Sequence, residues 1–178
     1  MNIYMPMATT IRHGEITGTL FSSVVDYIRK KEILALNEEC ALVHWGCKQK
    51  DDFKSLVDLN GIENHDLFAK TTINDLEYVQ PDLVVFKNNV YLCNERKTRT
   101  AGFPDLIVEV WSESNSKAER DFKFNLYSNS PITEHWYIEQ DSNEVVCYFG
   151  GYKIKNQFLT DILATRSGLK FDLRYLAI

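Results

Sequence analysis

Apolar residues recur at the three- to four-residue period of a helix near the start of the chain. The residues on this face are Ile16, Leu20, Val24, Tyr27 and Ile28. Their spacing predicts a helix over residues 10–31.

In the middle of the chain, the pattern changes to continuous runs of β-branched and other apolar residues. Residues 82–86 read DLVVF and residues 105–111 read DLIVEVW, and a proline precedes each run. Such runs, bounded by prolines, predict two central β-strands. Residues 116–129 then return to a helical period, and Asn115 or Ser116 is suited to cap that helix.

Two further strands are predicted over residues 135–139 and 144–149, and the polar residues 141–143 between them indicate a hairpin. Residues 40–80 read as several short strands whose order the pattern leaves open. Residues 158–176 read as a short helix or an extended arm. The succession of helix, strands, two central strands, helix and hairpin predicts an α/β fold with a central mixed sheet and a helix on at least one face.

The composition fits a single globular domain over residues 1–178. Hydrophobic residues make up 44% of the chain and charged residues 25%, which is ordinary for a protein with a full core. The chain has no run of about 20 apolar residues, and its first residues lack the basic and apolar regions of a signal peptide. The four cysteines include no CxxC pair, so we expect reduced thiols and a cytoplasmic protein.

The net charge of -5 argues against a protein that coats nucleic acid through general electrostatics. This net charge is compatible with an enzyme that has a local basic surface and a metal ion that offsets phosphate charge. Residues 87–99 are the one candidate for such a surface. They hold Lys87, Arg96, Lys97 and Arg99 against a single acid, Glu95. An ordinary solvated loop is the alternative interpretation.

Acidic residues stand on both central strands. Side chains alternate between the two faces of a strand, so Asp82 shares a face with Phe86, and Asp105 shares a face with Glu109. An antiparallel pairing that sets Phe86 near Asp105 brings Asp82 opposite Glu109, and this register is a hypothesis. Adjacent strands lie about 4.8 Å apart, so these two carboxylates could hold one divalent cation. Asp105 lies about 13 Å along the strand from Glu109 and is treated as an accessory residue.

Carboxylates on the buried face of a sheet repel each other and lose hydration, so protons, cations or hydrogen-bond donors must compensate. A hard cation such as Mg²⁺ takes oxygen ligands and keeps several waters, which suits Asp82 with Glu109. An aspartate after a proline often makes only a turn hydrogen bond, and this alternative applies to Asp82 and more strongly to Asp105. Glu109 is harder to explain in this way, because it interrupts an apolar run in mid-strand.

The predicted helix over residues 116–129 carries a mixed stripe. Its members, at helical spacing, are Glu119, Phe122, Lys123, Leu126 and Tyr127. The apolar members should face the sheet, which brings Lys123 and Glu119 on or beside the inward face. A lysine there can orient a water and stabilise charge developing on a phosphate. A surface pair between Glu119 and Lys123, worth about 0.2–0.5 kcal/mol, is the alternative.

These residues together resemble a nuclease superfamily. A Pro-Asp pair ending in Asp82, with Glu109 on the next strand, resembles the PD-(D/E)xK superfamily. More narrowly, the run from EYVQPDLVVF through GFPDLIVEVWSESNSKAE to Lys123, Tyr127 and EHWYIE is similar to the Uma-two family of restriction-endonuclease-like proteins. The resemblance covers residues 76–140 well, and PMATTIRHGEI resembles that family's N-terminus more weakly.

The resemblance implies a restriction-endonuclease-like fold and metal-dependent hydrolysis of phosphodiester bonds in DNA, with Mg²⁺ or Mn²⁺ as the cofactor. It implies that Asp82 and Glu109 hold the metal. The superfamily has its lysine two residues after the glutamate, where this chain has Trp111. In the narrower family a helix lysine takes that part, and Lys123 matches it.

The resemblance also implies supporting residues around this centre. Glu119 and Tyr127 would support the metal ligands from the helix. A polar residue on the first helix often completes such sites, and either His13 or Glu15 fits this part. His135 stands where the narrower family more often has tyrosine, at a position away from the expected site.

The leading hypothesis is therefore a Mg²⁺-dependent DNA endonuclease, and cutting both strands needs two sites, which favours a homodimer. A non-catalytic nucleic-acid-binding or interaction domain on the same fold is the second hypothesis, favoured by the acidic charge and Trp111. A hydrolase of nucleotides or small phosphoesters is the third. No GxSxG, GxGxxG or GxxxxGK[ST] motif is present, which argues against serine-nucleophile, dinucleotide and P-loop interpretations.

Overall fold

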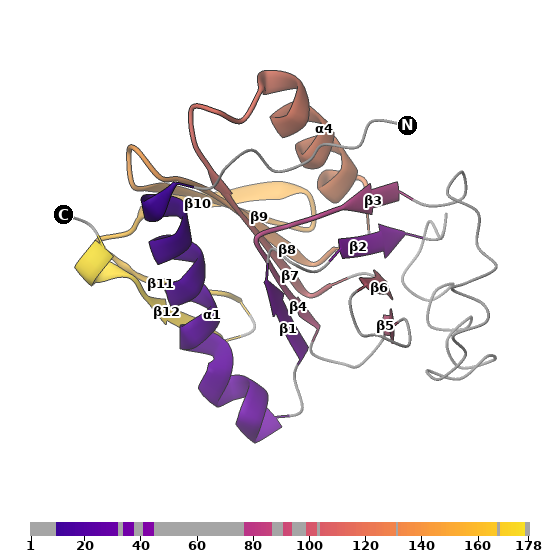
Figure 1. The fold of residues 1–178 in the computed structure, drawn as a ribbon, viewed down its shortest axis with the longest axis horizontal. Coiled ribbons are helices and arrows are strands. Elements are labelled where there is room, and N and C mark those ends of the chain that lie inside the picture. Colours follow the sequence, from indigo (N-terminus) through magenta and orange to yellow (C-terminus); the bar gives the residue numbers. More distant parts are fainter. Residues whose placement is uncertain are drawn as a thin grey trace.

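A six-stranded sheet lies at the centre of the molecule (Figure 1). The computed structural model describes residues 10–31, 34–37, 41–44, 77–86, 91–93, 99–102, 104–130, 132–166 and 168–176. The central sheet contains β1 (Leu34–Asn37), β4 (Leu83–Phe86), β7 (Leu106–Trp111), β8 (Glu134–Glu139), β9 (Glu144–Phe149) and β10 (Tyr152–Phe158), in that order. Strands β7 and β8 are parallel and the other neighbours are antiparallel, so the sheet is mixed, as expected.

Two smaller sheets accompany the central one. The four-stranded sheet has the order β3-β2-β6-β5, and its strands are β2 (Ala41–His44), β3 (Glu77–Val79), β5 (Tyr91–Cys93) and β6 (Arg99–Gly102). Strands β2 and β3 fall within residues 40–80, where short strands were expected, whereas no strand was predicted at β5 or β6. Most of residues 40–80, and most of the basic segment 87–99, lie outside the described residues.

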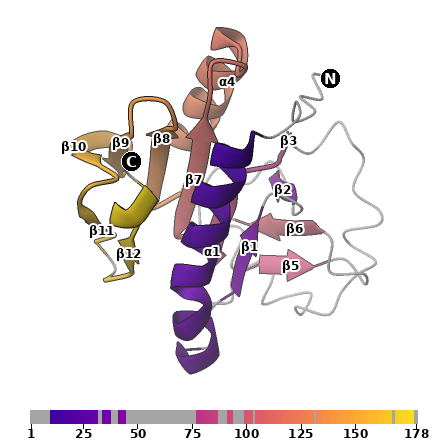
Figure 2. The same ribbon diagram turned by 60° about the vertical axis from the view of Figure 1, so that its left-hand side comes forward.

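Helices α1 (Ile11–Lys31) and α4 (Lys117–Ser128) lie on opposite faces of the central sheet (Figure 2). Both agree with their predicted ranges. Thr10 caps α1, because its hydroxyl accepts a hydrogen bond from the backbone N–H of His13 at 3.1 Å. Ser116 caps α4 in the same way, accepting from the N–H of Glu119 at 3.1 Å.

The two helices bury different sets of strand residues, because side chains alternate along each strand. Beneath α1, the buried residues are Ile16, Leu20 and Val24 of the helix with Leu83, Val85, Leu106, Val108 and Val110 of the strands. Beneath α4, they are Tyr127 of the helix with Val84, Phe86, Ile107, Trp111 and Tyr137 of the strands. Strands β4 and β7 are thus apolar on both faces, which explains their continuous hydrophobic runs.

The last part of the chain differs from the expectation. Residues 158–176 were expected to form a short helix or an extended arm, but they form a two-stranded hairpin of β11 (Ile162–Ala164) and β12 (Lys170–Asp172), followed by a 3-10 turn at Arg174–Leu176. Alternation explains the hairpin, because Leu163 and Phe171 are fully buried between exposed neighbours. Strands of three residues are too short to give a clear periodic signal.

Two further observations concern single features. The sulfur of the buried Cys147 accepts a hydrogen bond from the side-chain amide of Gln157 at 3.3 Å. Neither described helix is long and apolar enough to cross a membrane.

Replacing Leu20 with alanine tests the packing of α1 on the sheet. Leu20 is fully buried, and we expect its truncation to lower the free energy of unfolding by about 2–5 kcal/mol, through lost burial and a residual cavity. The matched control is Ile11→Ala on the same helix, where the side chain is 85% exposed and a change of at most about 0.5 kcal/mol is expected. Urea denaturation followed by circular dichroism measures both, and equal losses would contradict this packing.

Candidate active site

The register of β4 against β7 decides which acidic residues meet. Leu83 pairs with Val108, Val84 with Ile107 and Val85 with Leu106. One step further along the same ladder, Asp82 falls opposite Glu109, as the hypothesis for this pair required. At the start of β7 the pairing is irregular, because the N–H of Asp105 donates to the carbonyl of Val85 at 2.9 Å, one residue off this register.

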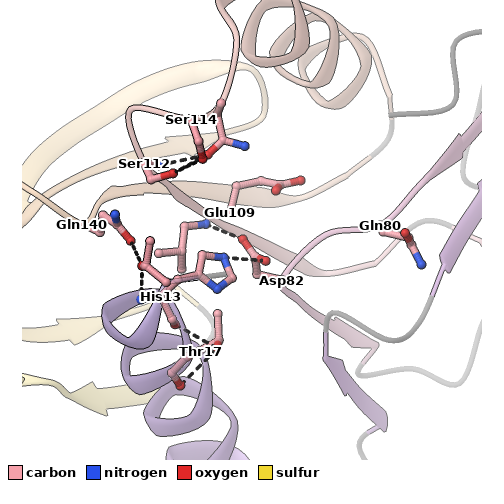
Figure 3. Close-up of polar contacts among 12 residues, drawn as sticks. His13, Thr17, Gln80, Asp82, Glu109, Ser112, Ser114 and Gln140 are labelled. Atoms are coloured by element: carbon pink, nitrogen blue, oxygen red, sulfur yellow. Dashed lines mark hydrogen bonds and ion pairs between the residues drawn. The ribbon is translucent and has the colours of Figure 1, made fainter. Parts of the chain in front are cut away.

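Asp82 stands just before β4 and joins three elements of the structure (Figure 3). Its Oδ2 accepts a hydrogen bond from the backbone N–H of Val110 on β7 at 2.6 Å. Its Oδ1 lies 3.0 Å from Nε2 of His13 on α1. Asp82 therefore connects the first helix to the strand that carries Glu109.

Glu109 is 1% exposed and faces α4. Its Oε2 lies 2.8 Å from Nζ of Lys123, and its Oε1 accepts a hydrogen bond from the hydroxyl of Tyr127 at 2.5 Å. Lys123 and Tyr127 are four residues apart and therefore neighbours on one face of the helix. A single helix face thus supplies a donor to each oxygen of this carboxylate.

Burial raises the pKa of Glu109 to about 7, because a buried carboxylate loses the hydration that favours its charged form. The ammonium of Lys123 opposes this rise, whereas the negative charge of Asp82 adds to it. The carboxyl group therefore titrates near neutral pH. Any additional positive charge close to it would favour its ionised form.

Lys123 is buried among acidic groups. Burial lowers its pKa, but Glu109, and then Asp82 and Glu119, outweigh burial, so the pKa of the ammonium is raised. Glu119 contributes at longer range, with its Oε1 3.7 Å from Nζ. Lys123 is therefore a positively charged group at the centre of the site. The pair between Glu119 and Lys123 that was the alternative interpretation is present, but it is not at the surface, since Lys123 is only 8% exposed.

The structure places the remaining expected residues at different distances from this centre. Of the two candidates on α1, His13 is brought to Asp82. Glu15 is exposed and pairs with Arg12, 3.8 Å away. Glu119 lies one helical turn before Lys123 and accepts a weak hydrogen bond, 3.4 Å long, from the side-chain amide of Asn115. Asp105 is half-buried at the start of β7, four residues before Glu109.

Other contacts around the site involve residues that the sequence did not single out. The hydroxyl of Thr10 donates to Oε1 of Gln140 at 3.0 Å and so ties the first turn of α1 to the end of β8. The hydroxyls of Ser112 and Ser114 lie 2.6 Å apart in the loop after β7. Backbone groups and small polar side chains of this kind carry no periodic signal in a sequence.

An aromatic layer fills the space between α4 and the sheet beside Glu109. Trp111, at the position of the superfamily's lysine, stacks on Tyr137 with ring centroids 4.2 Å apart. The guanidinium of Arg120 lies over the Trp111 ring, 4.9 Å from its centroid. His135 is fully buried and stacks on Tyr148. The tryptophan thus takes part in packing, and the only cation that reaches Glu109 among the described residues is Lys123 from the helix.

The donor set of this site fits a hard divalent cation. Mg²⁺ is commonly held by one or two carboxylates with water completing its shell, and Asp82 and Glu109 supply two carboxylates on neighbouring strands. Burial raises the pKa of Glu109 and the negative charge of Asp82 adds to the rise, whereas a cation close to the carboxylate would favour its ionised form. Among the described residues, no group of three or more His, Cys, Asp or Glu side chains is arranged to hold a metal, so water ligands would be needed.

Comparisons with known proteins identify the family and the fold. Residues 64–174 match the model of the Uma2 family, described as "Putative restriction endonuclease". A crystal structure from Anabaena variabilis, described as a putative nuclease belonging to DUF820, has a similar fold, with a TM-score of 0.65 and 15% sequence identity. The similarity covers 99% of this chain and 87% of that one. No curated protein matches the sequence.

Replacing Tyr127 with phenylalanine tests the support of Glu109. The change removes one donor from a buried carboxylate, so we expect the free energy of unfolding to fall by about 1–3 kcal/mol and the pKa of Glu109 to rise further. Chemical denaturation measures the first effect, and carboxyl titration by NMR the second. The matched control is Tyr152→Phe, where the side chain is 81% exposed. An unchanged pKa of Glu109 in Tyr127→Phe would contradict the hydrogen bond.

Protonation of His135 makes the free energy of unfolding depend on pH. Burial lowers its pKa to about 4 from 6.5, so the unfolded chain binds more protons than the folded protein between these values. Stability should therefore fall as the pH drops from 6.5 to 4, by at most roughly 3 kcal/mol. His135→Phe is expected to remove this part of the loss of stability at low pH. Denaturation at several pH values measures it, and identical pH profiles for the two proteins would refute the assignment.

Proposed function

The chain belongs to the Uma2 family, and from this premise we propose that it is a divalent-metal-dependent endonuclease that hydrolyses phosphodiester bonds in DNA. Nucleases with restriction-endonuclease-like folds generally use divalent metal ions. We propose Mg²⁺ or Mn²⁺ for this chain, with Asp82 and Glu109 as the protein ligands.

One observation carries the proposal. Asp82 and Glu109 come from opposite positions on neighbouring strands, and Nζ of Lys123 lies 2.8 Å from Glu109 on the side of α4. Two carboxylates from neighbouring strands and one ammonium beside Glu109 would supply the parts that phosphodiester hydrolysis needs, namely cation ligands and a positive group for the charge that develops on phosphate.

Each residue has a distinct part in the proposed chemistry. When bound, the metal would neutralise phosphate charge and acidify water. Lys123 would orient the attacking water and stabilise the negative charge that grows on the phosphate oxygens. Its raised pKa keeps it protonated at neutral pH, which suits an electrostatic part better than that of a general base.

Supporting residues would hold the ligands in place. Tyr127 fixes one oxygen of Glu109 through its 2.5 Å hydrogen bond. His13 and the N–H of Val110 fix the two oxygens of Asp82. Such partners commonly orient metal ligands and maintain their affinity. Glu119, beside Lys123, would add negative charge that keeps the ammonium protonated.

A second candidate function has one specific observation in its favour. Each of the four carboxylate oxygens of Asp82 and Glu109 contacts a protein group, so these contacts can act as a purely structural network. In that case the chain would be a non-catalytic nucleic-acid-binding domain. The two candidates differ in whether Mn²⁺ stabilises the protein and in whether DNA is cut.

The decisive experiment combines cleavage with metal binding. Lys123→Met and Glu109→Gln should each reduce Mg²⁺- or Mn²⁺-dependent nicking of supercoiled plasmid by roughly 10²-fold or more. Wild-type protein should show a Mn²⁺-dependent rise in melting temperature, and Glu109→Gln should lose it. Light scattering on the same samples measures whether the protein is the homodimer that cutting both strands favours.

Lys117→Met is the matched control, because Lys117 lies on the same helix but pairs with Asp121 at the exposed surface. It should cut DNA like the wild type. Circular dichroism of each variant distinguishes loss of chemistry from loss of the fold. Wild-type protein that cuts neither DNA nor RNA with either metal, and is not stabilised by Mn²⁺, would favour the non-catalytic candidate.

A further inference from the structure

The face of the central sheet that carries Glu109 extends beyond α4 onto β9 and β10 (Figure 2). Residues directly opposite each other on neighbouring strands share a face, so the registers identify which residues continue this face. Glu109 pairs with Tyr137, and Tyr137 pairs with Val146. On flanking rungs, Tyr148 pairs with Lys153, and Glu144 with Phe158.

Exposure increases steadily along this face away from the candidate active site. Glu109 and Tyr137 are 1% and 3% exposed beneath α4. On β9, Val146 and Tyr148 are half-buried, and on β10 Lys153 is exposed. Phe158 is 50% exposed. Helix α4 therefore covers β7 and β8, and among the described residues its last aromatic contact is Phe124 against Tyr148.

The opposite face of the same two strands is covered. Val145 is fully buried, Cys147 is 2% exposed and Gln157 is 5% exposed. These residues belong to, or border, the core that includes α1 and the β11–β12 hairpin. Exposure on β9 and β10 is thus a property of one face, and that face is the one that carries the candidate active site.

We propose that this open face, formed by Val146, Tyr148, Lys153 and Phe158, is a platform on which a nucleic-acid strand lies as it leaves the active site. The inference rests on the proposed nuclease function and adds the surface that holds the substrate. Tyr148 and Phe158 would stack on bases, and Lys153 would contact a phosphate. Aromatic side chains combined with a cation on an open sheet are a common arrangement for single-stranded nucleic acid.

The distance from Glu109 to the platform suits a nucleic-acid strand. Val146 is two strand spacings from Glu109, roughly 10 Å across the sheet. With nucleotides about 3.4 Å apart along a stacked strand, roughly three nucleotides would reach from the cleavage point to the platform. The charge also suits a nucleic-acid strand, because Glu144 and the Glu139 opposite it on β8 lie at the Phe158 end of this face, whereas Lys153 lies at the other end.

A second copy of the chain fits this face less well. Strand β10 carries a register shift between Lys153 and Lys155, and lysines with a bulge are typical of edge strands that avoid pairing with another strand. A two-fold contact through this edge would also bring like charges together. Lys153 needs a negatively charged partner, and the rings of Tyr148 and Phe158 need flat rings to stack on, and nucleic acid supplies both.

The test measures binding without cleavage, in EDTA, by fluorescence anisotropy of a labelled 12-nucleotide single-stranded DNA. Phe158→Ala should weaken binding roughly tenfold. Lys153→Ala should weaken it and lower the slope of log affinity against log salt by about one. Because no metal is present, these results do not depend on whether the protein cuts DNA.

Two matched controls sharpen the comparison. Tyr152→Ala removes an aromatic side chain that is 81% exposed on the same strand, but on the opposite face according to its pairing with Phe149. Lys117→Ala removes an exposed lysine on α4. Both should bind DNA like the wild type.

Three results would overturn the platform. The first is that Phe158→Ala and Lys153→Ala lose no more affinity for the DNA strand than the control variants do. Another is wild-type protein that does not bind the strand at all. The third is a fall in oligomer mass in Phe158→Ala by light scattering, which would assign the face to a second copy. A protein that binds through these residues but never cuts would retain the platform and lose only the proposed nuclease activity.

Discussion

The buried carboxylate of Glu109 is the constraint that organises the centre of this molecule. A carboxylate that is 1% exposed is costly unless donors or cations surround it. Helix α4 supplies both from one face, with the ammonium of Lys123 and the hydroxyl of Tyr127 each on one oxygen. Helix α4 is therefore held over β7 by its polar contacts with Glu109 as well as by apolar packing.

Asp82 extends this arrangement to the other side of the sheet. It accepts a hydrogen bond from the backbone of β7 and contacts His13 of α1, so both helices reach the same pair of carboxylates. The negative charge of Asp82 raises the pKa of Glu109, which is unfavourable for folding alone. A cation bound by both carboxylates would offset this repulsion, and this links the structure to the proposed chemistry.

Trp111 differs from the lysine that the resemblance to the PD-(D/E)xK superfamily predicts at its position. The position two residues after Glu109 holds a tryptophan that packs on Tyr137, and the positive charge comes from the following helix. Helix α4 can take this part because its first turn is held against the strands, where Arg120 donates to the carbonyl of Ser112 and pairs with Glu139. The site thus depends on helix docking in place of a lysine on the strand itself.

Local patterns in the sequence were sufficient for both helices, the central strands β4 and β7 and the β8–β9 hairpin, because the helices are long and periodic and the central strands are continuous apolar runs that follow prolines. They also singled out Glu109, since an acid inside an apolar strand needs compensation, and the opposition of Asp82 and Glu109 followed once a register was assumed. The β11–β12 hairpin, the choice of His13 over Glu15 and the open face of β9 and β10 depended on long-range contacts. Periodicity reports which face of an element is apolar, whereas partners distant in the chain are determined by how the elements pack.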